Sequence, residues 1–223
     1  MHRTRIKVCC IESEMESAMA VRAGASALGL VSHMPSGPGV IPEARIADIA
    51  RAAPPAVGTF LLTSAREAEL IVEQQRRCHV NTVQLCDAPD PGVHAALRDA
   101  LPGVSLVQVI HVEDSAALDD AKNVASHVDA VLLDSGKPSA TVQELGGTGR
   151  VHDWSVSRRI VDALDIPVFL AGGLNAGNVT DAIHEVRPYG VDLCTGVRTD
   201  GALDAAKLDR FFSACAAADQ SAC

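Results

Sequence analysis

The sequence has few aromatic residues and fewer basic than acidic side chains. Only one Trp, one Tyr and four Phe occur in 223 residues, and 19 Lys and Arg compare with 28 Asp and Glu, giving a formal net charge of −9. Nucleic-acid binding requires clustered basic residues, and single strands also require aromatic stacking platforms. The composition therefore argues against a nucleic-acid partner, but it is compatible with a small anionic ligand, which needs only local donors.

Long apolar runs and paired metal-binding cysteines are also missing. Polar and basic residues open the chain at Met1 to Arg5, so we expect neither a signal peptide nor a membrane span. The seven cysteines, an odd number, include no C-x-x-C pair typical of zinc ribbons and redox motifs. We therefore expect reduced thiols in a cytoplasmic protein, and no bound metal.

Apolar residues are abundant and fall into short strand-like segments. A chain of 223 residues with 48% hydrophobic content suits one α/β domain, which we expect to span residues 1–223. β-branched runs alternate with longer segments that bear Ala, Glu and Arg. The predicted strands are Arg5–Cys9, Ala27–Val31, Val57–Leu62, Thr82–Leu85, Ser105–Ile110, Ala130–Asp134, Val168–Ala171 and Val191–Cys194.

Helical patterns lie between these strands, and several of them open with Ser, Asp or Pro, as helix starts require. They cover residues 13–23, 43–52, 65–78, 91–100, 115–126, 154–164, 176–186 and 204–217. Eight strands with eight crossover helices predict a (β/α)8 TIM barrel, because an open flavodoxin-like sheet would need fewer units. The Ala-rich end of the chain is expected to fray.

In such a barrel the chemistry lies at the carboxyl ends of the strands. One apolar strand ends in Asp134 and is followed by the glycine-rich Gly146-Gly147-Thr148-Gly149. Gly172-Gly173 and Thr195-Gly196 follow the last two strands, where barrels commonly bind a phosphate through backbone N–H groups. The pattern predicts an acid beside an anion site, although tight turns are an alternative use of the same glycines.

Several segments, spread over nearly the whole chain, match one known family. They are Lys7-Val8-Cys9, Val83-Gln84-Leu85, Leu133-Asp134-Ser135 with the Gly146–Gly149 loop and Asp153-Trp154, Leu170-Ala171-Gly172-Gly173-Leu174 with Asn178-Val179, and Asp192 with Thr195-Gly196-Val197. Together they resemble the phosphoribosylanthranilate isomerase family of tryptophan biosynthesis. The resemblance implies a cofactor-free Amadori rearrangement of an N-(5'-phosphoribosyl) arylamine to a 1-amino-1-deoxyribulose 5-phosphate. The expected partner is a phosphorylated sugar, and the expected state is a monomer or homodimer.

The resemblance also implies roles for individual residues. Asp134 would be the general acid that protonates the furanose ring oxygen, and Cys9 the general base that takes the proton from the second ribose carbon. A thiol needs electropositive help to ionise, which Lys7 would supply unless it is a barrel-core residue held by a carboxylate. The residues expected to bind the phosphate are Gly147, Gly149, Gly172, Gly173, Thr195 and Gly196.

The end of the site that would receive the arylamine departs from the family. Ser36-Gly37-Pro38-Gly39-Val40 replaces a Ser-Pro-Arg motif whose arginine is expected to bind the anthranilate carboxylate. Cys86-Asp87 replaces His-Gly, Cys10 replaces the Gly after the catalytic cysteine, and Arg198 replaces Glu. Cys86, Asp87, Arg150 and Arg198 are the aglycone candidates, the two arginines being either replacement cations or solvated surface residues.

Three alternatives stay open on the sequence. The same barrel and phosphate site could act on a different phosphorylated substrate in a specialised pathway, or bind a sugar phosphate without converting it. Without the resemblance, Cys9 is typical of a small buried hydrophobe and Asp134 of a helix cap. A thiolate-rich metal site is the third alternative, built from Cys9 or Cys10 with Cys86 and Cys194, near His33 and His111.

Overall fold

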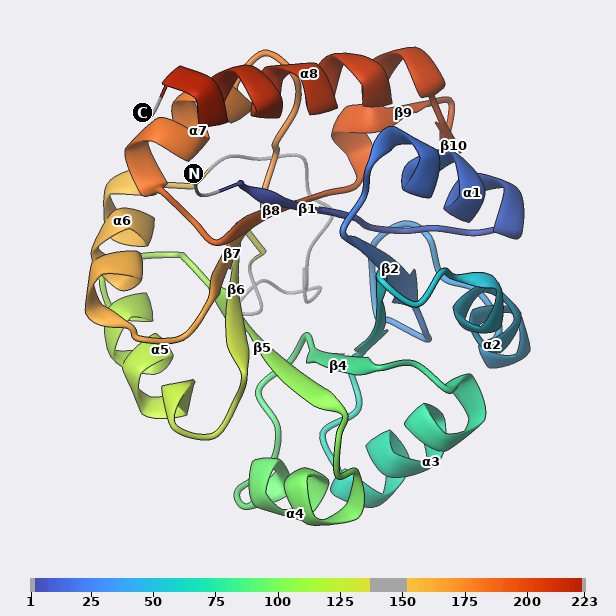
Figure 1. Ribbon diagram of the computed structural model, residues 1–223. Coiled ribbons are helices and arrows are strands. Elements are labelled where there is room, and N and C mark those ends of the chain that lie inside the picture. The colour runs from blue at the N-terminus through green and yellow to red at the C-terminus, as the bar shows by residue number, and fades with distance from the viewer. Residues whose placement is uncertain (1–2, 137–151, 222–223) are drawn as a thin grey trace.

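The computed structural model describes residues 3–136 and 152–221 and shows a closed parallel barrel. Neighbouring strands pair in chain order, and β1 pairs with β8 to close the sheet, with helices around the outside (Figure 1). This confirms the predicted (β/α)8 barrel. The strands are β1 (Arg5–Val8), β2 (Ala27–Val31), β3 (Gly58–Thr63), β4 (Thr82–Leu85), β5 (Ser105–His111), β6 (Ala130–Asp134), β7 (Val168–Leu170) and β8 (Gly190–Leu193).

The helices follow the predicted segments, with ends that move by a few residues. Side-chain caps fix two of the starts: the Ser13 hydroxyl accepts from the Glu16 N–H at 3.2 Å, and the Asp153 carboxylate accepts from the Ser155 N–H at 2.9 Å. The helices are α1 (Glu14–Ala23), α2 (Glu43–Ala52), α3 (Ala68–Cys78), α4 (Val93–Ala100), α5 (Ala117–Ala125), α6 (Trp154–Ala163), α7 (Val179–Val186) and α8 (Ala205–Ser221).

The last helix is longer than predicted, because it continues to Ser221 rather than ending at residue 217. The backbone N–H and hydroxyl of Thr4 donate to the Asp219 carboxylate at 3.0 and 2.6 Å. Phe211 and Cys215 of α8 are buried against the barrel. These contacts tie the end of the chain to its beginning, and Figure 1 shows the two termini on the same side of the barrel.

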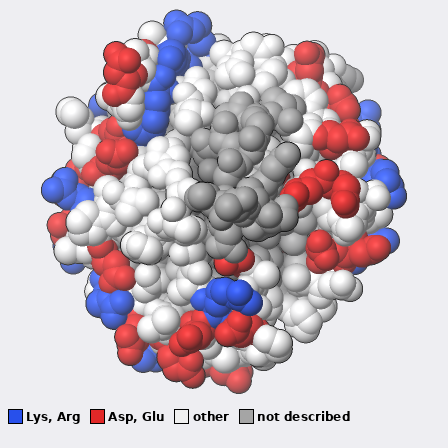
Figure 2. Space-filling view, turned by 180° about the vertical axis from the view of Figure 1, so that it is seen from behind, with Lys and Arg blue, Asp and Glu red and all other residues white. Residues whose placement is uncertain are grey.

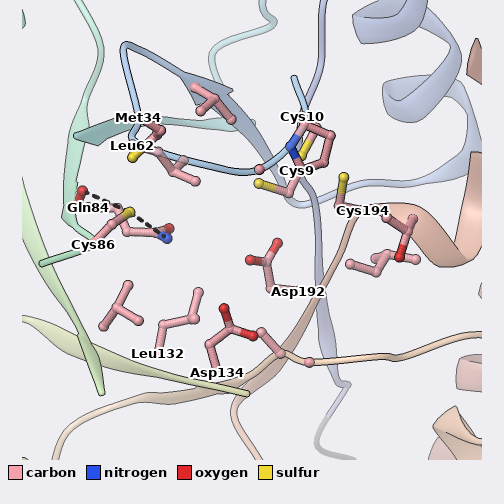
Figure 3. A pocket seen from close by; sticks show the side chains of 18 of the residues that line it. Cys9, Cys10, Met34, Leu62, Gln84, Cys86, Leu132, Asp134, Asp192 and Cys194 are labelled. Atoms are coloured by element: carbon pink, nitrogen blue, oxygen red, sulfur yellow. Dashed lines mark hydrogen bonds between the residues drawn. The ribbon is translucent and has the colours of Figure 1, made fainter. Parts of the chain in front are cut away.

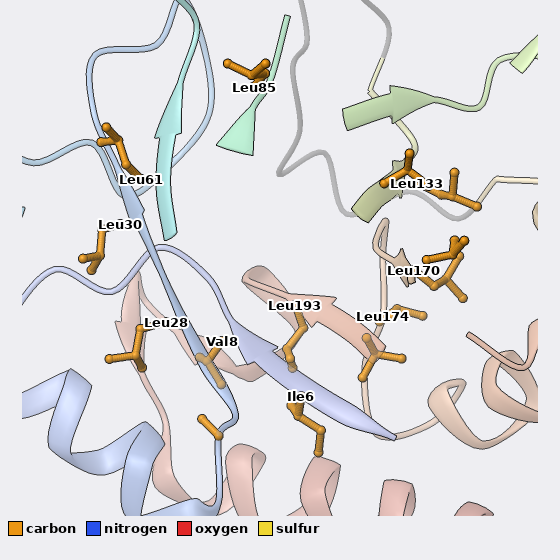
Figure 4. Packing of buried hydrophobic residues seen from close by; sticks show 14 of the residues in the cluster. Ile6, Val8, Leu28, Leu30, Leu61, Leu85, Leu133, Leu170, Leu174 and Leu193 are labelled. Atoms are coloured by element: carbon orange, nitrogen blue, oxygen red, sulfur yellow. The ribbon is translucent and has the colours of Figure 1, made fainter. Parts of the chain in front are cut away.

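Alternate residues of each strand pack into two different layers. Ile6, Val8, Leu28 and Leu30 belong to the layer between strands and helices (Figure 4). A second cluster fills the barrel interior, with Phe60, Val107, Ala130 and Phe169 among its members. Because side chains alternate across a strand, Lys7 and Cys9 share the face opposite to Ile6 and Val8. This register directs the chemical residues of β1 into the barrel.

A short segment between β8 and α8 has no counterpart in the predicted elements. It consists of the 3-10 turn η1 (Thr195–Val197) and a hairpin of β9 (Arg198–Thr199) and β10 (Ala202–Leu203), elements too short to give a periodic pattern. No helix of the described part is long and apolar enough to cross a membrane. Acidic and basic side chains are interspersed around the rim of the face in Figure 2.

Candidate active site

A pocket opens at the carboxyl ends of the strands. Cys9 and Asp134, the two residues expected to do acid–base chemistry, both line it, together with Asp192 (Figure 3). They come from the ends of β1, β6 and β8, and each is at least nine-tenths buried. The barrel thus brings together side chains that are up to 183 residues apart in the sequence, from 9 to 192.

Cys9 lies immediately after β1, where its N–H donates to the Leu193 carbonyl at 2.8 Å. A hydrogen bond from Cys10 lowers the pKa of the Cys9 thiol, with help from the charge of Lys7, whereas burial acts to raise it. Gly29 of β2 leaves room for the sulfur, because a Cβ at Gly29 would lie only 2.7 Å from Cys9 Sγ. The site therefore favours the thiolate, the form that a base requires.

Lys7 lies below this thiol as a fully buried cation. Its Nζ donates to Asp192 Oδ2 at 2.8 Å and lies 5.3 Å from the centroid of the Phe60 ring. Burial alone would lower the pKa of Lys7, but Asp192 and the nearby thiols Cys9 and Cys86 raise it overall. Lys7 is thus a barrel-core residue held by a carboxylate, one of the two possibilities left open by the sequence, and its charge also favours the Cys9 thiolate.

Asp134 ends β6 on the other side of the pocket. Its Oδ1 accepts from the Ser135 N–H at 2.8 Å. Burial raises the pKa of the Asp134 carboxyl above its ordinary value, and the Ser135 hydrogen bond and the charge of His111 offset only part of that effect. A raised pKa favours the protonated form that a general acid needs. Burial is thus the main cause of the shift, and Asp87 is not among its principal causes.

The glycines after β7 and β8 form one end of the pocket. Gly172 and Gly173 line it with φ of 88° and 64°, and no described residue accepts a hydrogen bond from their N–H groups. Thr195 lines the same end, and Gly196 packs so closely that a Cβ there would lie 2.1 Å from the Leu174 carbonyl oxygen. N–H groups without an acceptor among the described residues, on glycines that have no side chain to crowd a ligand, suit a phosphate.

The residues predicted to bind the aglycone do not all line the pocket. Cys86 lines the pocket and is buried, and burial raises the pKa of its thiol. Asp87 instead lines a neighbouring surface groove with His111 and Gln108, and its Oδ1 accepts from the Ala88 N–H. Gly147, Gly149 and Arg150 lie outside the described residues.

The interpretation of Arg198 as an aglycone ligand or a solvated surface residue is wrong. Its side chain is buried, and its Nη1 donates to Glu16 Oε1 of α1 at 2.9 Å and to the Gly201 carbonyl at 2.7 Å. The other terminal nitrogen donates to the Cys10 carbonyl and to Glu16 Oε2. The terminal nitrogens of this buried guanidinium are therefore satisfied locally, whereas Nε has no partner among the described residues, and the pairing with Glu16 was not evident from the sequence.

The metal alternative finds no support in the described residues. Within 3–136 and 152–221, no three His, Cys, Asp or Glu side chains are arranged so that they could hold a metal ion. The thiols of Cys9, Cys10 and Cys194 interact with one another instead, since hydrogen bonds to Cys194 and Cys9 raise the pKa of Cys10.

Three further residues that line this pocket, Asp192, Gln84 and Met34, had no role predicted from the sequence. Asp192 and Gln84 each carry a buried oxygen, Oδ1 and Oε1, without a hydrogen-bond partner among the described residues, so both can accept from a ligand. Their signal was a polar residue inside an apolar strand, which a barrel directs inward. Met34 lies in the loop after β2, where no periodic pattern marks it.

The fold and the pocket together define a class, a (β/α)8-barrel enzyme with an acid and a thiol at the carboxyl ends of its strands. Residues 6–214 match the family model described as N-(5'phosphoribosyl)anthranilate (PRA) isomerase. The chain is 37% identical over 199 residues to N-(5'-phosphoribosyl)anthranilate isomerase of Haloferax volcanii, which covers 89% of this chain and 86% of that protein.

Solved structures show the same relationship. Phosphoribosyl anthranilate isomerase from Thermotoga maritima is 27% identical and superposes with a TM-score of 0.81, covering 96% of this chain and 99% of that one. Another phosphoribosyl anthranilate isomerase, in complex with reduced 1-(o-carboxyphenylamino)-1-deoxyribulose 5-phosphate, is 25% identical with a TM-score of 0.78 and the same coverage. The chain belongs to the N-(5'-phosphoribosyl)anthranilate isomerase family, and it is an isomerase.

Proposed function

We propose that this isomerase converts an N-(5'-phosphoribosyl) arylamine into the corresponding 1-amino-1-deoxyribulose 5-phosphate, with Asp134 as acid and Cys9 as base. The observation that carries the proposal is the pair of opposite shifts in one pocket: the pKa of the Cys9 thiol is lowered mainly by Cys10, and the pKa of the Asp134 carboxyl is raised by burial. Each shift favours the protonation state that the proposed role requires.

The steps follow from these protonation states. The Asp134 proton goes to the furanose ring oxygen, the C1–O bond breaks, and the nitrogen lone pair forms an iminium at C1. The positive charge acidifies the C2 hydrogen, which Cys9 removes as a proton to leave an enolamine. Tautomerisation of the enolamine gives the 2-ketone, so atoms and electrons balance without a cofactor. Asp192 Oδ1 and Gln84 Oε1, both unpartnered among the described residues, would accept from the sugar hydroxyls.

Binding of the phosphate at one end of the pocket would orient the substrate. We propose that Gly172, Gly173, Thr195 and Gly196 hold the 5'-phosphate, with Gly147 and Gly149 as further contributors that lie outside the described residues. Support comes from the positive φ of Gly172 and Gly173 and from the close approach of Gly196 to Leu174. The sugar then lies between Cys9 and Asp134. A small phosphorylated sugar, rather than nucleic acid, is the partner.

Two variants test the reaction directly. We expect Cys9→Ala and Asp134→Asn each to lower turnover of in situ generated N-(5'-phosphoribosyl)anthranilate about 10²- to 10⁴-fold, the usual contribution of a positioned base or acid. The assay follows the loss of substrate fluorescence above the enzyme-free rate. Cys78→Ala is the matched control, because Cys78 is a buried thiol at the end of α3, away from the pocket. Turnover that survives both pocket changes would refute these roles.

The compartment and the oligomeric state of the protein are also proposed. Free thiols at all six described cysteines are consistent with a cytoplasmic protein. We propose a monomer or a homodimer, and the solution mass from light scattering distinguishes the two. A barrel that binds a sugar phosphate without converting it would show a phosphate analogue bound with equal affinity in wild type and in Cys9→Ala, and no turnover in either.

A further inference from the structure

Three thiols meet at one side of the active-site pocket. Cys9 and Cys10 follow β1, Cys194 follows β8, and all three line the pocket. The Cys9 N–H donates to the Leu193 carbonyl at 2.8 Å, which places the end of β1 beside the residue that precedes Cys194. Figure 3 shows the three side chains grouped on the side of the pocket away from Cys86.

The backbone of Cys10 turns its side chain toward the other two thiols. Consecutive side chains of an extended strand point to opposite faces, so Cys10 would point away from the pocket if β1 continued through it. Instead Cys10 has φ of 60°, in the left-handed region, and its side chain lines the pocket beside Gly39. Hydrogen bonds link its thiol to both Cys194 and Cys9. Residues in this strained conformation cluster at functional sites, which points to a role for the Cys10 thiol.

Cys9 is the thiol of this group that an oxidant meets in its reactive form. Peroxides react with thiolates far faster than with thiols, and Cys9 has the lowered pKa. Oxidation of Cys9 to a sulfenic acid removes the proposed base, and further oxidation to the sulfinic acid is irreversible in most proteins. A neighbouring thiol prevents this, because it converts the sulfenic acid into a disulfide that reductants reverse.

We propose that Cys9, Cys10 and Cys194 form a site of reversible oxidation, in which a peroxide oxidises Cys9 and the oxidation passes to a disulfide between Cys10 and Cys194. With hydrogen peroxide, the Cys9 thiolate forms an S–O bond, the O–O bond breaks, and hydroxide leaves. The Cys10 sulfur displaces the sulfenic hydroxyl, which leaves as water with the Cys10 proton, and a Cys9–Cys10 disulfide forms. Cys194 gives its proton to the hydroxide and its thiolate displaces Cys9. One disulfide and two waters result, and Cys9 returns to the thiolate.

The geometry favours Cys194 over Cys9 as the final partner of Cys10. The Cα atoms of adjacent residues are about 3.8 Å apart across a trans peptide, whereas unstrained disulfides join Cα atoms about 4.4–6.8 Å apart. A Cys9–Cys10 disulfide is therefore strained and exchanges readily. In the final state Cys9 has lost its hydrogen bond with the Cys10 thiol. We expect kcat/KM at neutral pH to fall about tenfold, the smallest usual effect of a hydrogen bond to a charged group, and to recover with dithiothreitol.

Mass spectrometry of tryptic peptides tests the disulfide without reference to activity. Cys9 and Cys10 lie in the peptide of residues 8–22, and Cys194 lies in that of residues 160–198, because trypsin does not cleave before Pro188. The folded protein is treated with stoichiometric hydrogen peroxide, alkylated and digested without reductant. We expect the two peptides to be joined, with Cys9 alkylated. Separate peptides, whether they carry a sulfinic Cys9, a Cys9–Cys10 disulfide or no oxidation, overturn the proposal.

Cys194→Ala tests the transfer of the oxidation by its effect on the rate, which rests on the proposed function. Without Cys194 the oxidised base stays blocked, so peroxide should lower turnover of N-(5'-phosphoribosyl)anthranilate about 10²- to 10⁴-fold, against about tenfold in wild type. Each rate is compared with that of the same protein before oxidation, and Cys78→Ala, at a buried thiol away from the pocket, should behave like wild type. Equal losses in Cys194→Ala and wild type overturn the transfer. A wild type that is inactive before oxidation overturns the proposed function and leaves the peptide result decisive for the disulfide.

Discussion

The reactivity of Cys9 depends on its neighbours in space. Cys10 and the charge of Lys7 lower the pKa of its thiol, and Gly29 leaves the space that the sulfur occupies. Burial by itself would make Cys9 an inert core thiol, as burial does for Cys86, whose pKa it raises. Gln84 and the charge of Lys7 also act to lower the pKa of Cys86, but burial outweighs them there, whereas at Cys9 the effect of Cys10 is larger than that of burial. The role of Cys10 can be tested directly.

Cys10→Ala should move the rate profile of the enzyme to higher pH. The hydrogen bond from Cys10 is the largest cause of the lowered pKa of Cys9, so its loss raises that pKa. The active form has Cys9 deprotonated, and the ascending limb of kcat/KM against pH is therefore expected at higher pH in the variant. Cys10→Ser, which keeps a donor, should retain the wild-type profile more closely. An ascending limb that does not move in Cys10→Ala would show that Cys10 does not tune the base.

Gly29→Ala should displace the base without changing any ionisable group. The new Cβ would lie 2.7 Å from Cys9 Sγ and 3.0 Å from Cys9 Cα, distances that require Cys9 to shift. Misplacement of a catalytic group by a fraction of an ångström to an ångström lowers kcat/KM by about 10- to 100-fold. Steady-state kinetics, with circular dichroism to establish the fold, checks this. A wild-type kcat/KM in a folded variant would mean that Gly29 does not position the thiol.

At the scale of secondary-structure elements, the β9–β10 hairpin is bonded to α1, a contact that was not predicted from the sequence. Arg198 of β9 joins it to Glu16 of α1, with side-chain exposures of 6% and 11%, and Glu16 also accepts from the Leu203 N–H of β10. The ion pair fastens the segment after β8 to the first helix, next to the carbonyl of Cys10. It therefore supports the backbone that carries Cys9 and Cys10.

Arg198→Met should destabilise the protein, because it leaves the Glu16 carboxylate buried without its cation. We expect the free energy of unfolding, measured by urea denaturation at neutral pH, to fall by about 3 kcal/mol. Arg51→Met is the control, since the exposed Arg51–Asp48 pair is worth less than about 1 kcal/mol. Equal losses in the two variants would contradict a structural role for the buried pair.

The same ion pair predicts a dependence of stability on pH. Burial acts to raise the pKa of Glu16, but the Arg198 hydrogen bonds and two backbone N–H groups lower it below the ordinary value of 4.5 overall. A depressed carboxyl pKa contributes stability that is fully present above 4.5 and is lost as the pH falls through the folded-state value. Urea midpoints of wild type should therefore decline below pH 4.5 more steeply than those of Arg198→Met.

At the scale of the whole molecule, β8 pairs with β1 to close the barrel, and α8 contacts the beginning of the chain. β1 pairs with β8, Thr4 binds Asp219 of α8, and Phe211 of α8 is fully buried. A closed sheet has no edge strand, so opening one unit exposes two unpaired edges. We therefore expect the barrel to unfold as one cooperative body.

Phe211→Ala tests this cooperativity. Truncation of a buried phenylalanine costs about 3–5 kcal/mol. Fluorescence of Trp154 in α6, the only tryptophan, and far-UV circular dichroism should report the same lowered urea midpoint. Leu70→Ala, at a site that is 49% exposed, should move the midpoint little. Separate transitions for the two probes would show that α8 detaches on its own.

The sequence determined the repeating architecture and the ends at which chemistry occurs. Apolar runs such as Ala130–Asp134 specify buried parallel strands, and a strand that ends in Asp134 or precedes Gly172 marks the carboxyl end of the barrel. These features depend on residues near one another in the chain, which is why they can be read from one sequence. The resemblance added the expected roles of Cys9 and Asp134.

The partners of the buried charges and of the Cys9 thiol depend on contacts between segments that are distant in the sequence. The partner of Lys7 is Asp192, the partner of Arg198 is Glu16, and the sulfur of Cys9 meets Gly29, none of which is marked by spacing. Whether a charge is free for a ligand or already neutralised depends on which strands and helices meet, because burial and hydrogen bonding act through space. For that reason Arg198 is a structural residue of this enzyme and Asp192 a residue of its pocket.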